Sequence, residues 1–115
     1  MDAFELSVMI ERPLEETFAV LANLENDVKW HRAFVEVRNL SGGSHGVGAR
    51  FLVFEEFLGQ RSSGAEYEVT EYETNRLVGW KTVSGPLKLK LWRTFEPVDG
   101  GTRFVVRYEG SQTAS

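Results

Sequence analysis

Apolar and polar residues alternate along the first ten residues of the chain, which predicts a strand with one buried face. The apolar face of this strand consists of Phe4, Leu6, Val8 and Ile10. After Pro13 the spacing becomes that of a helix with one apolar stripe, formed by Leu14, Phe18, Leu21 and Ala22. Pro13 suits the first helical position, because its missing N–H group has no helical partner there. A second short helix is expected over residues 24–31.

Beyond these helices the chain has the pattern of strands and turns. The predicted strands, which end at runs of Gly, Pro, Asn, Asp or Ser, cover residues 33–40, 48–58, 61–72, 76–83, 87–95 and 102–109. Short connections between consecutive strands indicate an antiparallel meander. We therefore expect one α+β domain over residues 1–110, in the order strand, two helices, six strands. Residues 111–115 have no periodicity and are expected to form a disordered tail.

The composition excludes several classes of function. The 115 residues include no cysteine, which excludes disulfides, thiolate metal ligands and a cysteine nucleophile. A net charge of −4 argues against a nucleic-acid partner. No apolar run approaches the ~18 residues needed to span a membrane, and the first residues lack the pattern of a secretory signal. A cytoplasmic location is therefore expected. No metal-binding or phosphate-binding motif is present, and no cofactor is expected.

Aromatic residues make up 12% of the chain and are the main candidates for a ligand site. The candidate ligand-binding residues are Trp30, Phe34, Phe54, Tyr67, Trp80, Leu91, Arg93, Phe104 and Tyr108. Successive strand residues face opposite sides, so these side chains cannot all line one cavity. The alternative for each ring is core packing between sheet and helices.

Arg93 is the polar member of this set, and its predicted strand face is otherwise apolar. It shares that face with Leu89, Leu91 and Phe95. A guanidinium in such a position orients a ligand carbonyl or carboxylate through its forked donors. Alternatively, it pairs with an inward glutamate such as Glu55 or Glu71. The sequence leaves both interpretations open.

Two further residues are candidates for proton transfer. His31 lies beside Trp30 at a junction between helix and strand, where it acts either as a general acid or base or as a capping residue. Glu55 is followed by Glu56, so one of the two side chains faces inward, where burial would raise the pKa of its carboxyl. The alternative for both glutamates is the solvated face of the sheet. His45 lies in a Gly/Ser loop without a partner nearby in the sequence.

The order of elements and four short phrases resemble the START-like (Bet v 1-like) superfamily, in particular its polyketide cyclase/dehydrase-like branch. The four phrases are the strand running into a proline-started helix (8–18), the second helix with its tryptophan (23–30), the strand entry 46–50 and the last hairpin (95–103). The resemblance implies a helix-grip fold, in which a curved antiparallel sheet encloses an apolar cavity against helices. It also implies binding of a small hydrophobic ligand (polyketide-like, aromatic or lipidic) and suggests cyclisation or dehydration as the chemistry. Whether any chemistry takes place stays open.

One departure from the family pattern is clear. Members usually end in a long C-terminal helix, and this sequence stops where that helix would begin. An antiparallel sheet covered by two short helices alone would expose apolar side chains, so we expect that face to be covered by a second copy of the chain, a ligand or a missing segment, and most simply by a second copy. The superfamily also includes chaperone-activator-like modules that bind proteins through the sheet. A non-enzymatic interaction module is therefore the alternative function.

Overall fold

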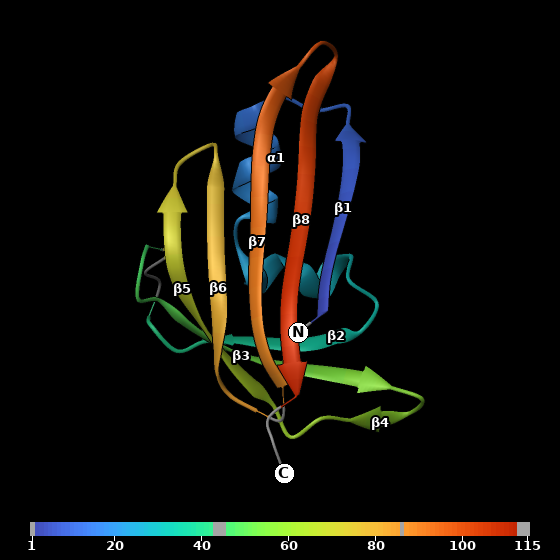
Figure 1. The fold of residues 1–115 in the computed structure, drawn as a ribbon, viewed down its shortest axis with the longest axis vertical. Coiled ribbons are helices and arrows are strands. Elements are labelled where there is room, and N and C mark those ends of the chain that lie inside the picture. The colour runs from blue at the N-terminus through green and yellow to red at the C-terminus, as the bar shows by residue number, and fades with distance from the viewer. Residues whose placement is uncertain (1, 43–45, 86, 113–115) are drawn as a thin grey trace.

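The computed structural model describes residues 2–42, 46–85 and 87–112 (Figure 1). His45 lies outside these residues. The chain begins with strand β1 (Asp2–Ile10), helix α1 (Leu14–Leu21) and the 3-10 helix η1 (Leu24–Lys29). The strands that follow are β2 (Phe34–Asn39), β3 (Arg50–Phe57), β4 (Gln60–Arg61), β5 (Ala65–Glu73), β6 (Leu77–Ser84), β7 (Leu87–Val98) and β8 (Gly101–Gln112).

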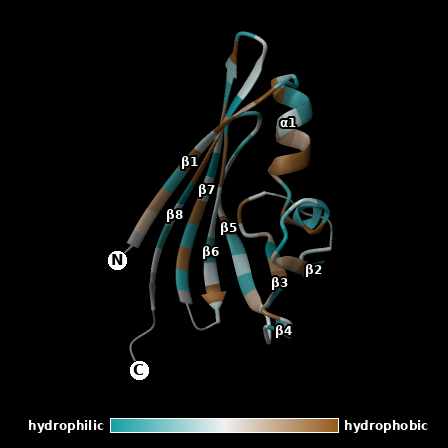
Figure 2. Ribbon diagram, turned by 90° about the vertical axis from the view of Figure 1, so that its right-hand side faces the viewer, coloured by the Kyte–Doolittle hydropathy of each residue, from teal (hydrophilic) through white to brown (hydrophobic). Residues whose placement is uncertain are grey.

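The strands form one antiparallel sheet in the order β1-β8-β7-β6-β5-β3-β2, and β4 pairs with β3 outside this path. The first strand thus pairs with the last, with Phe4 opposite Tyr108 and Ile10 opposite Thr102. Figure 2 shows that α1 and the turn of η1 lie on one side of the sheet, which we call the inner face. The predicted α+β helix-grip fold is confirmed, and within the described residues no helix follows β8.

Three local predictions differ from the structure. Pro13 is the residue before helix α1 and not its first helical residue. The predicted strand 61–72 is interrupted, because Gly64 adopts a φ of 101° that an extended strand does not contain; β4 ends before it and β5 begins after it. Strand β8 continues to Gln112, so Ser111 and Gln112, which were expected in the tail, pair with β7. Residues 113–115 lie outside the described residues.

A bulge in β5 changes which side chains face inward. Uninterrupted alternation predicts that Tyr67, Val69 and Glu71 share one face. The pairing of β5 with β6 shifts between Val69 and Glu71, and a bulge of this kind inverts the alternation beyond it. The Glu71 carboxylate instead accepts a hydrogen bond from Trp92 Nε1 on the outer face, at 3.1 Å. The next residue, Tyr72, packs against Phe18 of α1.

The core lies between α1, η1 and the central strands. Its largest buried apolar side chains are Phe18, Leu24, Phe51, Val53, Tyr67, Val69, Val78, Trp80, Leu91, Phe95 and Phe104. Phe18 joins helix to sheet, because its ring packs edge-on against Phe95 with centroids 5.0 Å apart. The apolar face of β1 is different: Phe4, Leu6 and Val8 are 57%, 50% and 43% exposed. This end of the inner face is therefore open to solvent.

Among the described residues, no helix is long and apolar enough to cross a bilayer.

Candidate functional site

Two neighbouring grooves occupy the inner face. The first, which we call the β1/β8 groove, has a volume of about 410 Å³. Alternate side chains of β1 and β8, which point to the inner face, form most of its wall. Residues at the ends of the two helices form its rim. Its lining consists of Phe4, Leu6, Val8, Ile10, Leu21, Trp30, His31, Arg93, Phe104, Val106 and Tyr108. Because nearly all of these side chains are apolar, the groove suits an apolar ligand.

His31 sits at the rim of this groove, immediately after η1. Its backbone N–H donates to Asp27 O at 2.7 Å, which closes the end of the 3-10 helix. Its Nδ1 accepts a hydrogen bond from the Ala33 N–H at 3.3 Å, so the neutral ring carries its proton on Nε2. The ring stacks on Phe34, with centroids 4.1 Å apart. His31 thus caps a turn, as one interpretation of the sequence held, and also lines the groove; its role as a general acid or base stays a prediction.

Arg93 enters the same region from β7 and is almost completely buried. Its Nη1 and Nη2 donate to the two carboxylate oxygens of Asp27 at 3.0 and 2.5 Å, and Nη1 also donates to the Leu21 carbonyl at 2.9 Å. The guanidinium lies between the rings of Trp30 and Trp80, 5.3 and 5.2 Å from their centroids. Arg93 therefore ties η1 and the end of α1 to the sheet.

This arrangement corrects the sequence interpretation of Arg93. Its carboxylate partner is Asp27 and not Glu55 or Glu71, because Glu71 faces outward and η1 presents Asp27 directly to β7. The two terminal nitrogens of Arg93 donate hydrogen bonds to Asp27 and to the Leu21 carbonyl, whereas its Nε is buried without a hydrogen-bond partner among the described residues. Arg93 is thus foremost a positioning residue for the rim of the β1/β8 groove.

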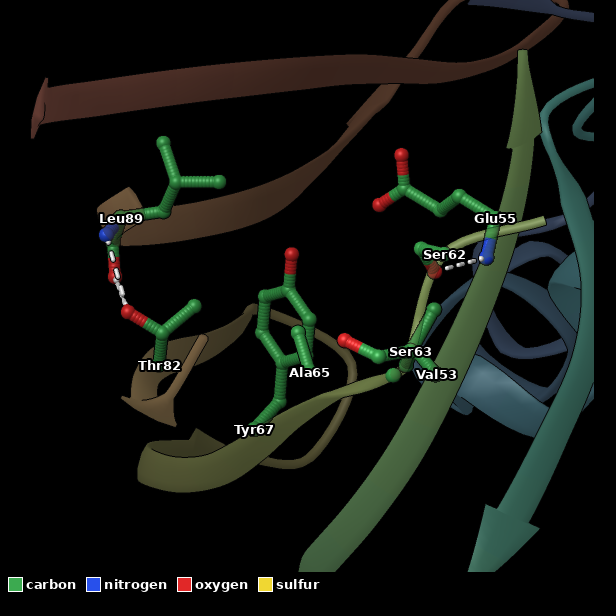
Figure 3. A pocket seen from close by; sticks show the side chains of 9 residues that line it. Val53, Glu55, Ser62, Ser63, Ala65, Tyr67, Thr82 and Leu89 are labelled. Carbon is green, nitrogen blue, oxygen red and sulfur yellow. Dashed lines mark hydrogen bonds between the residues drawn. The ribbon is translucent and has the colours of Figure 1, made fainter. Parts of the chain in front are cut away.

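The second groove, which we call the β3/β5 groove, has a volume of about 320 Å³ (Figure 3). It is lined by Val53, Glu55, Ser62, Ser63, Gly64, Ala65, Tyr67, Thr82 and Leu89. The Glu55 backbone N–H donates to Ser62 Oγ at 3.0 Å, which closes the short β3–β4 arm over one end of the groove. Figure 3 shows the Tyr67 hydroxyl pointing into the space between Leu89 and Glu55.

Each of the two grooves contains a tyrosine whose pKa is raised. Burial raises the pKa of the Tyr67 hydroxyl, and the charges of Glu55 and Tyr108 raise it further. Burial likewise raises the pKa of Tyr108, with an opposing contribution from Arg93 and smaller upward ones from Asp27 and Glu55. Tyr108 lines the β1/β8 groove, whereas Tyr67 and Glu55 line the β3/β5 groove. The Glu55 carboxylate thus raises the pKa of a tyrosine in each of the two grooves.

The structure brings most of the candidate residues to these grooves. The β1/β8 groove contains Trp30, His31, Arg93, Phe104 and Tyr108, and the β3/β5 groove contains Glu55 and Tyr67. The others lie elsewhere: Trp80 and Leu91 are buried in the core, and Phe34 is half-buried against His31.

Phe54 lies on the opposite face of β3 from Glu55. Its ring packs there between the guanidinium groups of Arg38 and Arg61. It lines neither of the two grooves.

Several site residues were not among the candidates from the sequence. The alternation of β1 indicated an apolar face but not its place in a groove. The sequence did not indicate that Asp27 is buried. In a short 3-10 helix, the spacing of apolar residues does not show which polar residue faces the core. Among the described residues, no group of three or more His, Asp or Glu side chains is arranged to hold a metal ion.

Comparison with known proteins agrees with this geometry. A family model for polyketide cyclase/dehydrase and lipid transport proteins matches residues 1–113. The fold is similar to that of the Zhui aromatase/cyclase from Streptomyces sp. R1128, with a TM-score of 0.83, 13% identity, and coverage of 99% of this chain and 70% of that chain. It is also similar to TTHA0849 from Thermus thermophilus, with a TM-score of 0.83, 16% identity, and coverage of 98% and 76%.

DR_A0006 from Deinococcus radiodurans is a third similar structure, with a TM-score of 0.77, 21% identity, and coverage of 97% of this chain and 84% of that chain. At these identities the likeness to solved structures shows the fold alone. A search of curated protein sequences found no match. The family model, in contrast, covers almost the whole chain, and its description agrees with a curved sheet that carries apolar grooves on its inner face. The chain belongs to the polyketide cyclase/dehydrase and lipid transport family.

Proposed function

We propose that this protein binds a small hydrophobic molecule on the inner face of its sheet, with the β1/β8 groove as the main site. The observation that carries the proposal is the lining of this groove: apolar strand residues and aromatic rings surround a volume of about 410 Å³. That volume lies within the range typical of small-molecule sites. The family description, which names cyclases, dehydrases and lipid transport, supports the same class of ligand.

The side chains favour a flat or elongated ligand, such as a polyketide-like, aromatic or lipidic molecule. Trp30 and Phe104 offer ring faces to it, and Leu6 and Val8 offer aliphatic contacts. Arg93, held by Asp27, keeps Trp30 in place through its contact with the indole. The groove therefore has a preorganised aromatic rim beside a strand wall that solvent can reach.

Cyclisation or dehydration of such a ligand requires groups that move protons, and His31 and Glu55 are the residues we propose for this role. His31 lines the β1/β8 groove with its proton on Nε2 when neutral. Glu55 lines the β3/β5 groove. A ligand that extends along the inner face would meet both side chains. The name of the Zhui aromatase/cyclase, whose fold is similar, supports this chemistry by analogy of fold.

The exposed face of β1 favours a second candidate function. Phe4, Leu6 and Val8 form an apolar row on an edge strand, and such rows are typical of interaction surfaces. We propose a second copy of this chain as the partner, in a homodimer that covers β1. The lack of cysteine fits a reducing compartment, and we expect the protein to act in the cytoplasm.

A matched pair of variants tests the ligand site. Leu6 and Leu40 are each 50% exposed, but only Leu6 lines the β1/β8 groove. With the uncharged fluorescent probe N-phenyl-1-naphthylamine, Leu6→Asn is expected to weaken binding by about tenfold, because the lost apolar contact amounts to part of a buried leucine. Leu40→Asn is expected to leave the affinity unchanged. Equal effects of the two variants would place the probe elsewhere.

Native mass spectrometry of the purified protein, first under gentle and then under denaturing conditions, tests the two candidate functions together. A small molecule that is retained only under gentle conditions would support ligand binding and reveal the class of compound. A dimer without ligand, dissociated by Leu6→Asn and not by Leu40→Asn, would favour the interaction module.

A further inference from the structure

The β3/β5 groove contains a tyrosine hydroxyl that has no hydrogen-bond partner among the described residues. The Tyr67 side chain is only 6% exposed, and its hydroxyl points into the groove (Figure 3). No hydrogen bond joins this hydroxyl to any described residue, although Glu55 and Tyr108 are close enough to influence its pKa. A hydroxyl that points into an apolar groove and has no protein partner among the described residues is available to bond to a molecule in that groove. The groove is therefore arranged for a molecule that supplies the missing bond.

Glu55 provides the second polar group of this groove. Other glutamates of the sheet are paired with arginines: Glu66 and Glu68 with Arg50, and Glu73 with Arg76. The Glu55 carboxylate has no such partner among the described residues, and it faces apolar walls formed by Val53, Ala65 and Leu89. An unpaired carboxylate in these surroundings favours a ligand group that donates a hydrogen bond.

We propose that Glu55 and Tyr67 together bind one hydroxyl group of a phenolic or enolic ligand. The ligand O–H donates to the Glu55 carboxylate, and the ligand oxygen accepts a hydrogen bond from the Tyr67 hydroxyl. This inference rests on the proposed function and specifies which hydrophobic molecules are preferred.

The donor and acceptor chemistry selects a hydroxyl over other groups. A ligand ammonium would satisfy Glu55 but has no lone pair for Tyr67. A ligand carbonyl would satisfy Tyr67 but leave the carboxylate without a donor. A hydroxyl satisfies both through a single oxygen atom. Because burial raises the pKa of Tyr67, its hydroxyl stays protonated and remains a donor across the neutral pH range.

Three two-ring probes separate these contacts: naphthalene, 2-methoxynaphthalene and 2-naphthol. Naphthalene has no polar group, 2-methoxynaphthalene accepts only, and 2-naphthol both donates and accepts. Dissociation constants for all three are to be measured by ligand-observed NMR with the wild-type chain and with Tyr67→Phe, Glu55→Gln and Tyr72→Phe. Tyr72→Phe is the matched control, because it removes a tyrosine hydroxyl from β5, the strand that carries Tyr67, at a residue that packs against Phe18 and lines neither groove.

The expected pattern is specific. Wild-type protein binds 2-naphthol most tightly. Tyr67→Phe weakens both oxygen-containing probes by about fivefold, the effect of one neutral hydrogen bond. Glu55→Gln weakens 2-naphthol alone, by about tenfold, because only this probe donates to the charged acceptor. Tyr72→Phe leaves the preference for 2-naphthol unchanged. The affinity for naphthalene stays constant in every variant, which also verifies that each variant is folded.

Equal affinity for the three probes in the wild-type protein would overturn this inference while leaving the proposed ligand binding intact. A loss of the preference in Tyr72→Phe as large as that in Tyr67→Phe would overturn it as well, since the effect would then not depend on the hydroxyl that lines the β3/β5 groove. Absence of binding by all three probes would count against both this inference and the proposed function.

Discussion

The buried ion pair between Asp27 and Arg93 provides the sharpest test of how the groove is held together. Asp27 is 0% exposed and Arg93 is 1% exposed, and two hydrogen bonds join them. Asp27→Asn keeps the shape of the side chain but removes its charge, so the guanidinium remains buried without a counter-charge. Removing one partner of a buried pair typically costs about 3–5 kcal/mol. The bond from Arg93 to the Leu21 carbonyl persists in the variant, so we expect a value near the lower end, about 3 kcal/mol.

Urea unfolding followed by tryptophan fluorescence measures this loss. With a slope of about 1.5 kcal/mol per molar urea, a loss of about 3 kcal/mol lowers the midpoint by about 2 M. Arg76→Ala serves as the control. It breaks the ion pair with Glu73 on the exposed surface, and we expect it to leave the midpoint unchanged.

A double-mutant cycle distinguishes a buried charge pair from simple packing. Arg93→Met leaves the Asp27 carboxylate buried alone and is expected to be as destabilising as Asp27→Asn. Combining Arg93→Met with Asp27→Asn removes both charges and is expected to cost less than the sum of the two single changes. A midpoint within experimental error of wild type for both single variants would refute the reasoning. So would strict additivity in the double variant.

Two further predictions concern stability. The folded-state pKa of Tyr67 lies above its unfolded value of about 10, so the free energy of unfolding should fall as the pH rises above 10. Tyr67→Phe should therefore reduce the difference between the urea midpoints measured at about pH 9 and pH 11. An undiminished difference would contradict this assignment. A Cβ at Gly101 would lie 2.0 Å from the Ile10 carbonyl oxygen, so Gly101→Ala should cost about 3 kcal/mol in the same assay. Gly46→Ala, whose added Cβ meets no atom within 4 Å, should change stability by less than about 0.5 kcal/mol, and similar midpoints for the two variants would refute the steric argument.

The fold could be predicted from the sequence because local patterns and turn residues agreed with it. Alternation on β1, β7 and β8 separated an apolar face from a polar one, and the structure shows that the apolar face is the inner one. Arg93 is buried among its apolar neighbours on the inner face of β7. The prediction of strand faces failed at the bulge before Glu71, where one extra residue inverts the alternation without any mark in the sequence.

The site was less predictable, because it depends on contacts between distant segments. Some of the aromatic candidates line the grooves. Trp80 and Phe54 are also aromatic, but Trp80 lies in the core and Phe54 lies on the outer face of the sheet. The partner of Arg93 comes from a 3-10 helix far away in the sequence. The Tyr67 hydroxyl, which has no hydrogen-bond partner among the described residues, can be placed in a groove only once β3 and β5 are known to lie side by side.

The pairing of β1 with β8 has a consequence for the synthesis of the protein. Strand β1 is synthesised before the other described strands, yet within the described residues its only strand partner is β8, the last strand of this sheet in chain order. Strand β1 therefore has no strand to pair with, and its apolar side chains stay exposed, until translation of the domain is almost complete. Non-local strand pairs of this kind slow folding and leave a nascent chain prone to aggregation. We expect chaperones that bind short apolar segments to recognise β1 during this interval and to release it once β8 docks.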